Sequence, residues 1–391
     1  TYFDFNNEKI KEIAKESSKL GIELFVLDDG WFGERNNDDC SLGDWFVNEE
    51  KLKGGLNSLA TDINKMGMQF GLWFEPEMIS PKSKLYEEHP DWCIHIDGRI
   101  RSEARKQLIL DLSRDEVCEA VIKMITDVLK SAPISYVKWD MNRNMTEIGS
   151  TAWPAKKQKE IAHRYMLGLY KILENITSNF PNILFESCSG GGGRFDGGML
   201  YYMPQTWTSD DTDAIERLMI QEGTSLVYPT SSMGSHVSAV PNHQVHRITP
   251  LNTRGVVAMA GSFGYELDVT KMNEEEKEEV KKQVEFYKNI RSTVQFGDLY
   301  RLKSSFDSNE VAWMNLSKDG KEVVVSYVKK YAEANVIPRR LKVKALDENS
   351  LYEVIETGEV FGGDELMYIG LEIGELMGDY QAKNWTLRKV D

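Results

Sequence analysis

The peptide SYVKWDMNR at residues 135–143 shows most clearly how this chain is built. Its apolar strand pattern gives way to polar side chains at Asp140, and an amphipathic helix pattern over Asp115–Lys130, with a capping box of Ser113 and Glu116, comes just before it. A helix that leads into a buried strand is the repeating unit of parallel α/β folds, whose chemistry lies at the carboxyl ends of the strands. The peptide therefore predicts a parallel sheet and the edge where a site is expected.

The same alternation of strand and helix patterns extends from the start of the chain to about residue 265. The first helix has Asn6 or Asn7 as its cap and closes at Gly21. Eight strands with helices between them favour a (β/α)8 barrel over an open doubly wound sheet. The predicted strands are Tyr2–Phe5, Ile22–Leu27, Gln69–Trp73, Ser135–Trp139, Ile183–Ser187, Gln205–Trp207, Leu226–Tyr228 and Val256–Ala260.

A different pattern begins near residue 296. A highly charged helix, capped by Asn273 and running to about Ile290, comes before it, and Asp319-Gly320 then gives a hairpin signal. We therefore predict an α/β fold in two domains, a (β/α)8 catalytic barrel with a truncated first strand over residues 1–295 and a small antiparallel β-sandwich over residues 296–391. The predicted strands of the second domain are Val311–Leu316, Val323–Val328, Tyr352–Thr357 and Met367–Ile369.

The composition argues against several classes of function. The 391 residues are 41% hydrophobic and carry 47 basic against 62 acidic side chains, a net charge of −15, which disfavours nucleic-acid and anionic-membrane partners. No apolar run is long enough to span a bilayer. Cys40, Cys93, Cys118 and Cys188 show neither zinc-ligand nor disulfide spacing, so we expect a cytoplasmic protein. Because the chain opens at Thr1, we also expect that an N-terminal segment was removed or not included.

Polar side chains gather where the predicted strands end. Carboxylates accept hydrogen bonds from hydroxyl groups and tryptophan faces cover the C–H face of a ring, so a mixture of the two at one barrel mouth suits a neutral sugar. The strand ends carry Asp28 and Asp29, Trp73 with Glu75 and Glu77, Asp140 and Asn142, Cys188 with a glycine run, and Trp207 with Asp210, Asp211 and Asp213.

The alternation of side chains along a strand sharpens the interpretation of one segment. Lys138, Asp140 and Asn142 project to the same side of an extended chain. A lysine beside Asp140 favours its charged form, which is the form that a carboxylate nucleophile needs. A second carboxyl that keeps its proton would serve as general acid and then base, and retaining glycoside hydrolysis places the two groups about 5–5.5 Å apart.

Each of these features also has a structural explanation. The segment Asp28–Gly30 is compatible with a plain turn after a strand. The segment Glu75–Glu77 favours a structural corner over a catalytic pair, because its proline sets a bend. Asp211 and Asp213 are either solvated or caps of a helix that begins near Ala214.

Two further clusters of residues could in principle form cofactor sites. The glycine run Gly190–Gly193 lacks the lysine and the serine or threonine of a P-loop, so it indicates close backbone approach to a ligand or a tight loop. His236, His243 and His246 match no metal-ligand motif, so a structural role is favoured for them. Phosphoryl-transfer and metal-hydrolase functions are therefore disfavoured.

Five motifs, in this order along the chain, resemble the bacterial-type α-galactosidases of glycoside hydrolase family 36. The resemblance covers the predicted barrel and extends into the β domain, and it implies a (β/α)8 barrel followed by a β-sandwich. The motifs are LDDGWFG at residues 27–33, WFEPEM at 73–78, YVKWDMNR at 136–143, CSGGGGRFD at 188–196 and WTSDD at 207–211.

The resemblance implies a retaining enzyme that releases terminal α-galactosyl residues from oligosaccharides of the raffinose and melibiose kind through a covalent galactosyl-aspartate. Asp140 matches the nucleophile of the family and Asp210 its acid/base. Asp28 and Asp29 match the pair that binds the 4-hydroxyl and the 6-hydroxyl side of galactose. No metal or organic cofactor is implied. The other matching substrate-binding positions are Trp73, Arg105, Lys138, Asn142, Cys188, Gly190 and Trp207.

One departure from the family concerns the N-terminus. Its members carry a large β domain before the barrel, which helps to assemble an oligomer and lends residues to a neighbour's active site. This chain begins inside the expected first strand, so we expect a fragment or a lineage without that domain, and a weakened homo-oligomer. Other functions stay open at this point: a galactosyl transferase of the raffinose- or stachyose-synthase kind, an α-N-acetylgalactosaminidase, or an inactive galactoside-binding fragment.

Overall fold

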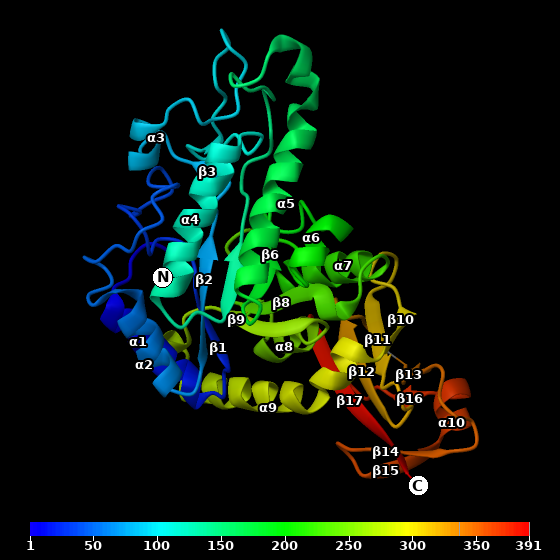
Figure 1. Cartoon of the computed structure of the whole chain (residues 1–391). Coiled ribbons are helices and arrows are strands. Elements are labelled where there is room, and N and C mark those ends of the chain that lie inside the picture. Colours follow the sequence, from blue (N-terminus) through cyan, green and yellow to red (C-terminus); the bar gives the residue numbers. More distant parts are fainter. Residues whose placement is uncertain (336, 391) are drawn as a thin grey trace. The chain divides into compact units, whose positions relative to one another are not determined.

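The computed structural model describes residues 1–335 and 337–390 of the chain. The chain, shown in Figure 1, divides into two compact units, Thr1–Thr206 and Trp207–Asp391. None of the helices in the described part is long and apolar enough to cross a membrane.

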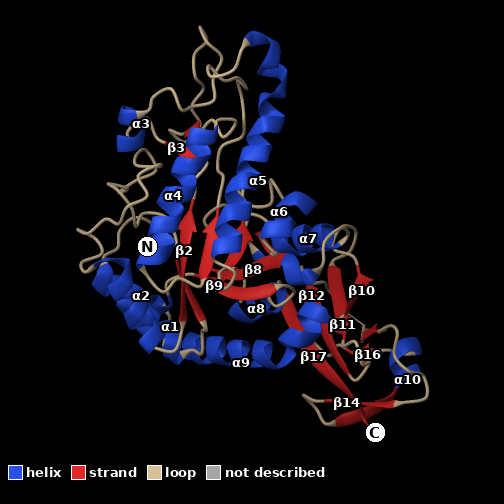
Figure 2. Ribbon diagram, in the orientation of Figure 1, coloured by secondary structure: helices blue, strands red, loops and turns tan. Residues whose placement is uncertain are grey.

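The first unit is built on parallel strands with helices between them (Figure 2). The strands pair in the order β1, β2, β5, β6 and β7, so their carboxyl ends lie at one edge. Lys138 on β5 lies between Trp73 on β2 and Glu186 on β6 in this register. The strands are β1 (Leu24–Leu27), β2 (Gln69–Phe74), β5 (Tyr136–Trp139), β6 (Leu184–Ser187) and β7 (Gln205–Trp207), and a short antiparallel pair is formed by β3 (Met78–Ile79) and β4 (Leu108–Ile109).

The helices of this unit place one apolar stripe each against the core. Helix α1 begins at a cap by Asn6, whose side chain accepts from the Lys9 amide, and ends before Gly21. Gly168 lets α5 approach the chain before α4, because a Cβ atom at this position would lie 1.9 Å from the Leu112 carbonyl oxygen. The helices are α1 (Asn7–Lys19), α2 (Gly55–Lys65), α3 (Lys84–Glu88), α4 (Asp115–Ser131), α5 (Ile161–Asn179) and α6 (Gly197–Tyr202).

The second unit contains a parallel pair with its helices and then an antiparallel β domain. Its first part comprises α7 (Ala214–Ser225), β8 (Met233–Ser238), α8 (Leu251–Ala258), β9 (Ser262–Glu266) and α9 (Glu274–Phe296). Helix α9 begins with the predicted cap, since Asn273 and Glu276 form a capping box, and it runs six residues beyond the predicted end at Ile290. The strands β8 and β9 are parallel.

The antiparallel β domain has two layers. Buried side chains of a six-stranded sheet, such as Tyr327 and Trp385, pack with Leu341 and Leu371 of a two-stranded sheet. The larger sheet has the order β10 (Asp298–Lys303), β11 (Glu310–Leu316), β12 (Glu322–Lys329), β17 (Gln381–Val390), β14 (Leu351–Val354) and β15 (Glu359–Gly362). The smaller sheet pairs β13 (Arg340–Leu341) with β16 (Leu371–Glu372), and α10 (Gly363–Tyr368) lies between β15 and β16 in the sequence.

The predicted fold class is confirmed, because seven strands of the described chain belong to parallel pairs and an antiparallel domain follows them. The predicted first strand is wrong. Tyr2–Phe5 forms a turn and an irregular segment with Tyr2 at a φ of 47°, and its apolar side chains are used for packing. Phe5 is buried, and the Lys51 ammonium lies 4.7 Å from its ring centroid.

Three other predicted strands are also wrong, because short apolar runs do not distinguish a strand from a helix. Leu226–Tyr228 is the turn after α7, and the strand is the more polar segment β8. Val256–Ala260 lies largely in α8, whose residues are buried nearly all round and so lack a helical stripe. Met367–Ile369 falls at the end of α10.

The predicted capping box before α4 is absent. Arg114 is the cap residue and makes no side-chain capping bond. The Ser113 hydroxyl donates instead to the Asp111 carboxylate at 2.5 Å, so it does not cap the backbone N–H groups at the start of α4.

Candidate active site

Asp140, the predicted nucleophile, lies directly after β5 and is 6% exposed. Its Oδ2 accepts from the Trp73 indole at 3.1 Å and from the Asn142 amide at 2.8 Å. Its Oδ1 accepts from the Met141 backbone N–H at 2.8 Å. Three N–H donors thus fix both oxygens of this side chain, and all three match the ionised carboxylate, which only accepts.

A second carboxyl group lies close to Asp140. Glu75 follows β2, is fully buried, and accepts from the Asn142 backbone N–H. Its Oε2 lies 3.3 Å from the Gln107 side-chain nitrogen. Burial, followed by the negative charge of Asp140, raises the pKa of Glu75 from its ordinary value of 4.5 to about 8.

Lys138 forms an ion pair with another of the predicted binding residues, Asp28. Its ammonium donates to Asp28 Oδ2 at 3.1 Å, and Asp28 itself is largely exposed at the strand end. Burial lowers the pKa of Lys138, but the charge of Asp28, with smaller contributions from Cys188 and Asp140, outweighs it and holds this pKa well above its ordinary range. The lysine therefore stays charged beside the carboxylates.

Asp29 forms an ion pair with a buried arginine. The Arg35 guanidinium is fully buried and forms a bidentate pair with Asp29, at 3.0 Å from Nε to Oδ1 and 2.8 Å from Nη2 to Oδ2. Its Nη1 donates to the carbonyl oxygens of Asp38 and Cys40, both at 2.9 Å. Burial raises the pKa of Asp29, and Arg35 opposes this shift. The Arg105 guanidinium lies 3.8 Å from the Asp38 carboxylate, so it belongs to the same cluster of charged residues.

The glycine-rich loop after β6 is brought against Asn142. Gly190 has a φ of 51° and Gly191 a φ of 84°, a conformation that side chains disfavour. A Cβ atom on Gly190 would lie 4.0 Å from Asn142 Oδ1, so the backbone faces the predicted site. Cys188 is buried, and its N–H donates to the Trp139 carbonyl at 2.7 Å.

Glu77 ties this loop to the sheet. It is fully buried and accepts from the Arg194 guanidinium at 2.8 and 2.9 Å, from the Trp139 indole at 2.9 Å and from the Tyr165 hydroxyl at 2.5 Å. Burial opposes the charge of Arg194, but Glu77 outweighs it and raises the pKa of Arg194. The segment Glu75–Glu77 is therefore a structural corner whose two glutamates reach the loops after β5 and β6.

We expect Glu77→Gln to lower the free energy of unfolding by about 3 kcal/mol, because it leaves the Arg194 charge buried without its partner. Urea unfolding followed by tryptophan fluorescence measures this change. The matched control is Asp127→Asn in the exposed pair with Lys123, which should change stability by less than about 0.5 kcal/mol. Equal effects of the two variants would contradict a role for the buried pair.

Trp207 and Asp210 belong to the second unit, where one arginine organises their segment. The buried Arg217 lies 4.4 Å from the Trp207 ring centroid and donates to the carbonyls of Ser209 and Asp211 at 2.9 and 2.8 Å. Arg217 therefore fixes the backbone on both sides of Asp210, whose side chain is exposed.

Asp213 and His236 of this unit make structural contacts. Asp213 caps α7 by accepting from the amides of Ile215 and Glu216 at 3.0 and 3.1 Å, as one of the two interpretations predicted. His236 packs on the Trp207 ring at 4.6 Å between centroids. Across the described residues, no group of three or more His, Cys, Asp or Glu side chains could hold a metal ion.

The structure links most of the predicted site residues of the first unit. Asp140 contacts Trp73 and Asn142, Lys138 contacts Asp28, and Gly190 faces Asn142. The sequence interpretation missed the supporting residues Arg35, Gln107, Arg194 and Arg217. Of these four residues, only Arg194 belongs to one of the five family motifs. A single sequence does not show which charged side chains will be buried in the fold.

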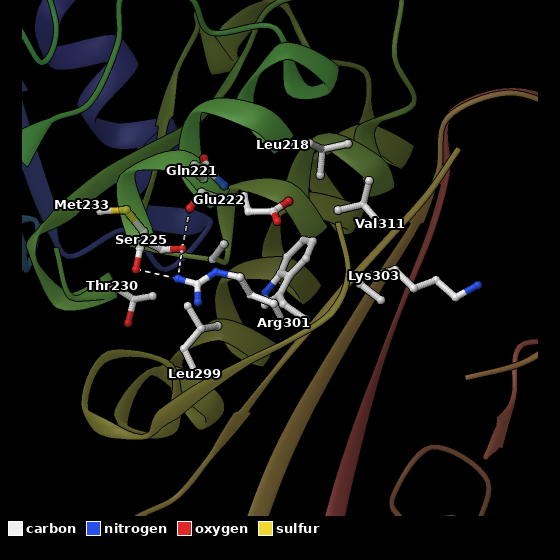
Figure 3. A pocket seen from close by; sticks show the side chains of 13 residues that line it. Leu218, Gln221, Glu222, Ser225, Thr230, Met233, Leu299, Arg301, Lys303 and Val311 are labelled. Carbon is white, nitrogen blue, oxygen red and sulfur yellow. Dashed lines mark hydrogen bonds between the residues drawn. The ribbon is translucent and has the colours of Figure 1, made fainter. Parts of the chain in front are cut away.

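Two hollows differ in what they could hold. One of about 460 Å³ lies beside Asn142 and Gly190 in the first unit and is also lined by Met141, Ser189 and Arg194. The other, in the second unit, measures about 40 Å³, and Arg301 reaches Ser225 across it (Figure 3). Ligand pockets usually measure about 300–1,000 Å³, so only the first hollow is large enough for a sugar.

Comparison with known proteins identifies the family of the chain. Residues 1–297 match the melibiase family and residues 310–387 the glycosyl hydrolase family 36 C-terminal domain. The whole chain is 62% identical to α-galactosidase AgaA of Geobacillus stearothermophilus and 52% identical to α-galactosidase Mel36A of Lactobacillus acidophilus, and it spans about half, 53%, of each.

Solved structures agree with these matches. The crystal structure of AgaA superposes on the full length of this chain with a TM-score of 0.98, the chain covering 54% of that structure. The α-galactosidase from Lactobacillus brevis, 46% identical, gives the same TM-score and coverage. With its two matching domains and these relatives, the chain belongs to glycoside hydrolase family 36.

Proposed function

We propose that this chain is the catalytic part of a retaining α-galactosidase that hydrolyses terminal α-galactosyl residues of raffinose- and melibiose-type oligosaccharides. The observation that carries the proposal is Asp140, a buried carboxylate fixed by three N–H donors. One of these donors, Asn142, also lines the hollow of about 460 Å³. A carboxylate that is fixed in this way has little freedom to lose when it attacks.

The proposed reaction has two displacement steps. Asp140 attacks the anomeric carbon while Asp210 donates its proton to the glycosidic oxygen, so the C–O bond to the leaving group breaks and a β-linked galactosyl-aspartate forms. Asp210, now ionised, takes a proton from water, whose oxygen attacks the same carbon and releases Asp140. Two inversions return the α-configuration, and the two aspartates end in their starting protonation states.

The polar groups at the ends of β1 and β5 support a galactose site. Asp28 and Asp29 would accept hydrogen bonds from sugar hydroxyls, while Lys138 would donate one. Ion pairs hold both carboxylates, since Lys138 pairs with Asp28 and Arg35 pairs with Asp29. Trp73, Arg105, Asn142, Cys188, Gly190 and Trp207 complete the proposed set.

The relatives support the substrate class and the catalytic pair. Variants of the Geobacillus enzyme have been crystallised in complex with raffinose and with stachyose. In each of these two variants a different aspartate is replaced, and the two positions are as far apart along that chain as Asp140 and Asp210 are along this one. This equal spacing supports the assignment of Asp140 and Asp210 as the reacting pair.

The test of the proposal is the configuration of the first product. We expect the purified chain to hydrolyse an aryl α-galactoside and ¹H NMR to show α-galactose before mutarotation. Early β-galactose would contradict the retaining mechanism. Product analysis at high acceptor concentration separates hydrolysis from galactosyl transfer, and an α-N-acetylgalactosaminide substrate tests the other alternative. Melibiose binding by calorimetry without turnover would instead indicate a galactoside-binding fragment.

The domain boundary at residues 295 and 296 stays a prediction, as does assembly into a homo-oligomer. A cytoplasmic location is supported by four cysteines that form no disulfide.

A further inference from the structure

Glu75 is a carboxyl group close to the nucleophile, and the proposed reaction has no use for it. It is fully buried and has no access to a sugar, yet it is joined to Asp140 through a single residue. The Asn142 backbone N–H donates to Glu75, and the Asn142 side-chain amide donates to Asp140 at 2.8 Å. The orientation of Asn142, and with it one of the three donors on the nucleophile, therefore depends on Glu75.

Two ionised carboxylates in this arrangement would repel each other with little water to screen them. Asp140 keeps three N–H donors, whereas Glu75 has the Asn142 N–H and a long contact of 3.3 Å to Gln107. Two positive groups act against this repulsion: the charge of Arg105 lowers the pKa of Glu75, and Glu75 also interacts with the charge of Arg35. Because burial and Asp140 outweigh them, the proton of the pair belongs on Glu75.

Gln107 gives an independent indication. Its side-chain oxygen is buried and has no hydrogen-bond partner, while its nitrogen faces Glu75 Oε2. A protonated Glu75 has an O–H group to donate at this oxygen, and a Gln107 amide turned by half a rotation presents its own oxygen as the acceptor. The unpartnered amide oxygen then acquires a donor.

We propose that Glu75 carries a proton at neutral pH and acts as an uncharged positioning residue that holds Asn142 against the nucleophile Asp140. This inference rests on the proposed role of Asp140. Ionisation of Glu75 would place a second negative charge beside Asp140 and disturb the Asn142 contact, so the proposed catalytic activity should fall at alkaline pH for a reason separate from the titration of the acid/base.

The first test is independent of activity. In the unfolded chain Glu75 loses its proton near its ordinary pKa of 4.5, and in the folded chain near a pKa of about 8. Between these values only the folded state holds the proton, so the free energy of unfolding falls as the pH rises from 4.5 to 8 and levels off above. Glu75→Gln, which cannot ionise, should lack this part of the fall in urea unfolding experiments. The same pH dependence in wild type and variant would overturn the proposal.

The second test measures kcat/KM for an aryl α-galactoside whose leaving group needs no proton, so that the acid/base does not set the alkaline limb. We expect the ratio of activity at about pH 9 to that at about pH 6 to be at least about fivefold higher in Glu75→Gln than in wild type. Superimposable profiles would contradict the positioning role.

A second variant keeps the inference testable if Glu75→Gln does not fold. Asp140→Asn removes the neighbouring charge, so the fall in the free energy of unfolding should end at a lower pH than in wild type. An unchanged end point would overturn the coupling of the two groups. An active Asp140→Asn enzyme would refute the proposed function, whereas the unfolding experiment would still report the proton on Glu75.

Discussion

Replacing Asp140 by alanine should lower kcat/KM for an activated aryl α-galactoside by at least about 10⁴-fold, because the variant has no group to form the covalent intermediate. The decrease should be in kcat, and the fold should stay intact. Initial rates of phenol release measure the decrease in kcat. The three donors on Asp140 come from the Trp73 indole, the Asn142 amide and the Met141 backbone, none of which is changed by the substitution.

Added azide distinguishes a lost nucleophile from a damaged site. The alanine variant leaves space on the face from which Asp140 attacks, so azide should restore turnover and yield the β-galactosyl azide. Asp127→Asn on the exposed face of α4 serves as the control and should keep wild-type rates. Full activity of Asp140→Ala, or an α-galactosyl azide as product, would contradict the assignment.

Asp210→Asn should slow the hydrolysis of melibiose by about 10³- to 10⁴-fold, because a sugar leaving group must be protonated as it departs. The first step with an activated aryl α-galactoside should suffer far less, since that leaving group departs without a proton. The second step still needs a base, so a burst of phenol followed by a slow phase is expected. Stopped-flow absorbance measures both phases.

The control for this experiment is an aspartate of the same unit that is remote from the proposed chemistry. Asp298→Asn on β10 changes an exposed ion pair with Lys318 and should leave both phases unchanged. Equal losses for melibiose and the aryl substrate would show that Asp210 does not act as the acid.

The extent of sequence-based prediction differed between elements for physical reasons. Strands such as Tyr136–Trp139 were predictable because apolar runs of this length are flanked by polar ends. The strand β8 was missed because it contains buried serines, such as Ser235, whose hydroxyl donates to Gln221. The sequence does not show whether a serine hydroxyl will find a hydrogen-bond partner in the folded chain.

The candidate site divides in the same way. Residues that follow strands, such as Asp28 and Asp140, were predictable because the carboxyl ends of parallel strands meet at one edge. The buried supports were not, because Arg35 and Arg217 are recruited from loops and helices by three-dimensional packing alone. The pair Glu75 and Glu77 was interpreted as a corner, and both side chains are fully buried and bonded to the loops after β5 and β6.

The hydrogen bonds of Glu77 have a consequence for the engineering of this protein. The glycine loop, the strand β5 and the helix α5 each contribute one group to the same carboxylate, namely Arg194, Trp139 and Tyr165. A loop transplanted from a distant homologue would bring its own arginine position without the matching indole and phenol. Loop exchanges aimed at new sugar selectivity should therefore transfer all three side chains together. Otherwise the grafted loop will lack the contacts that fix its position.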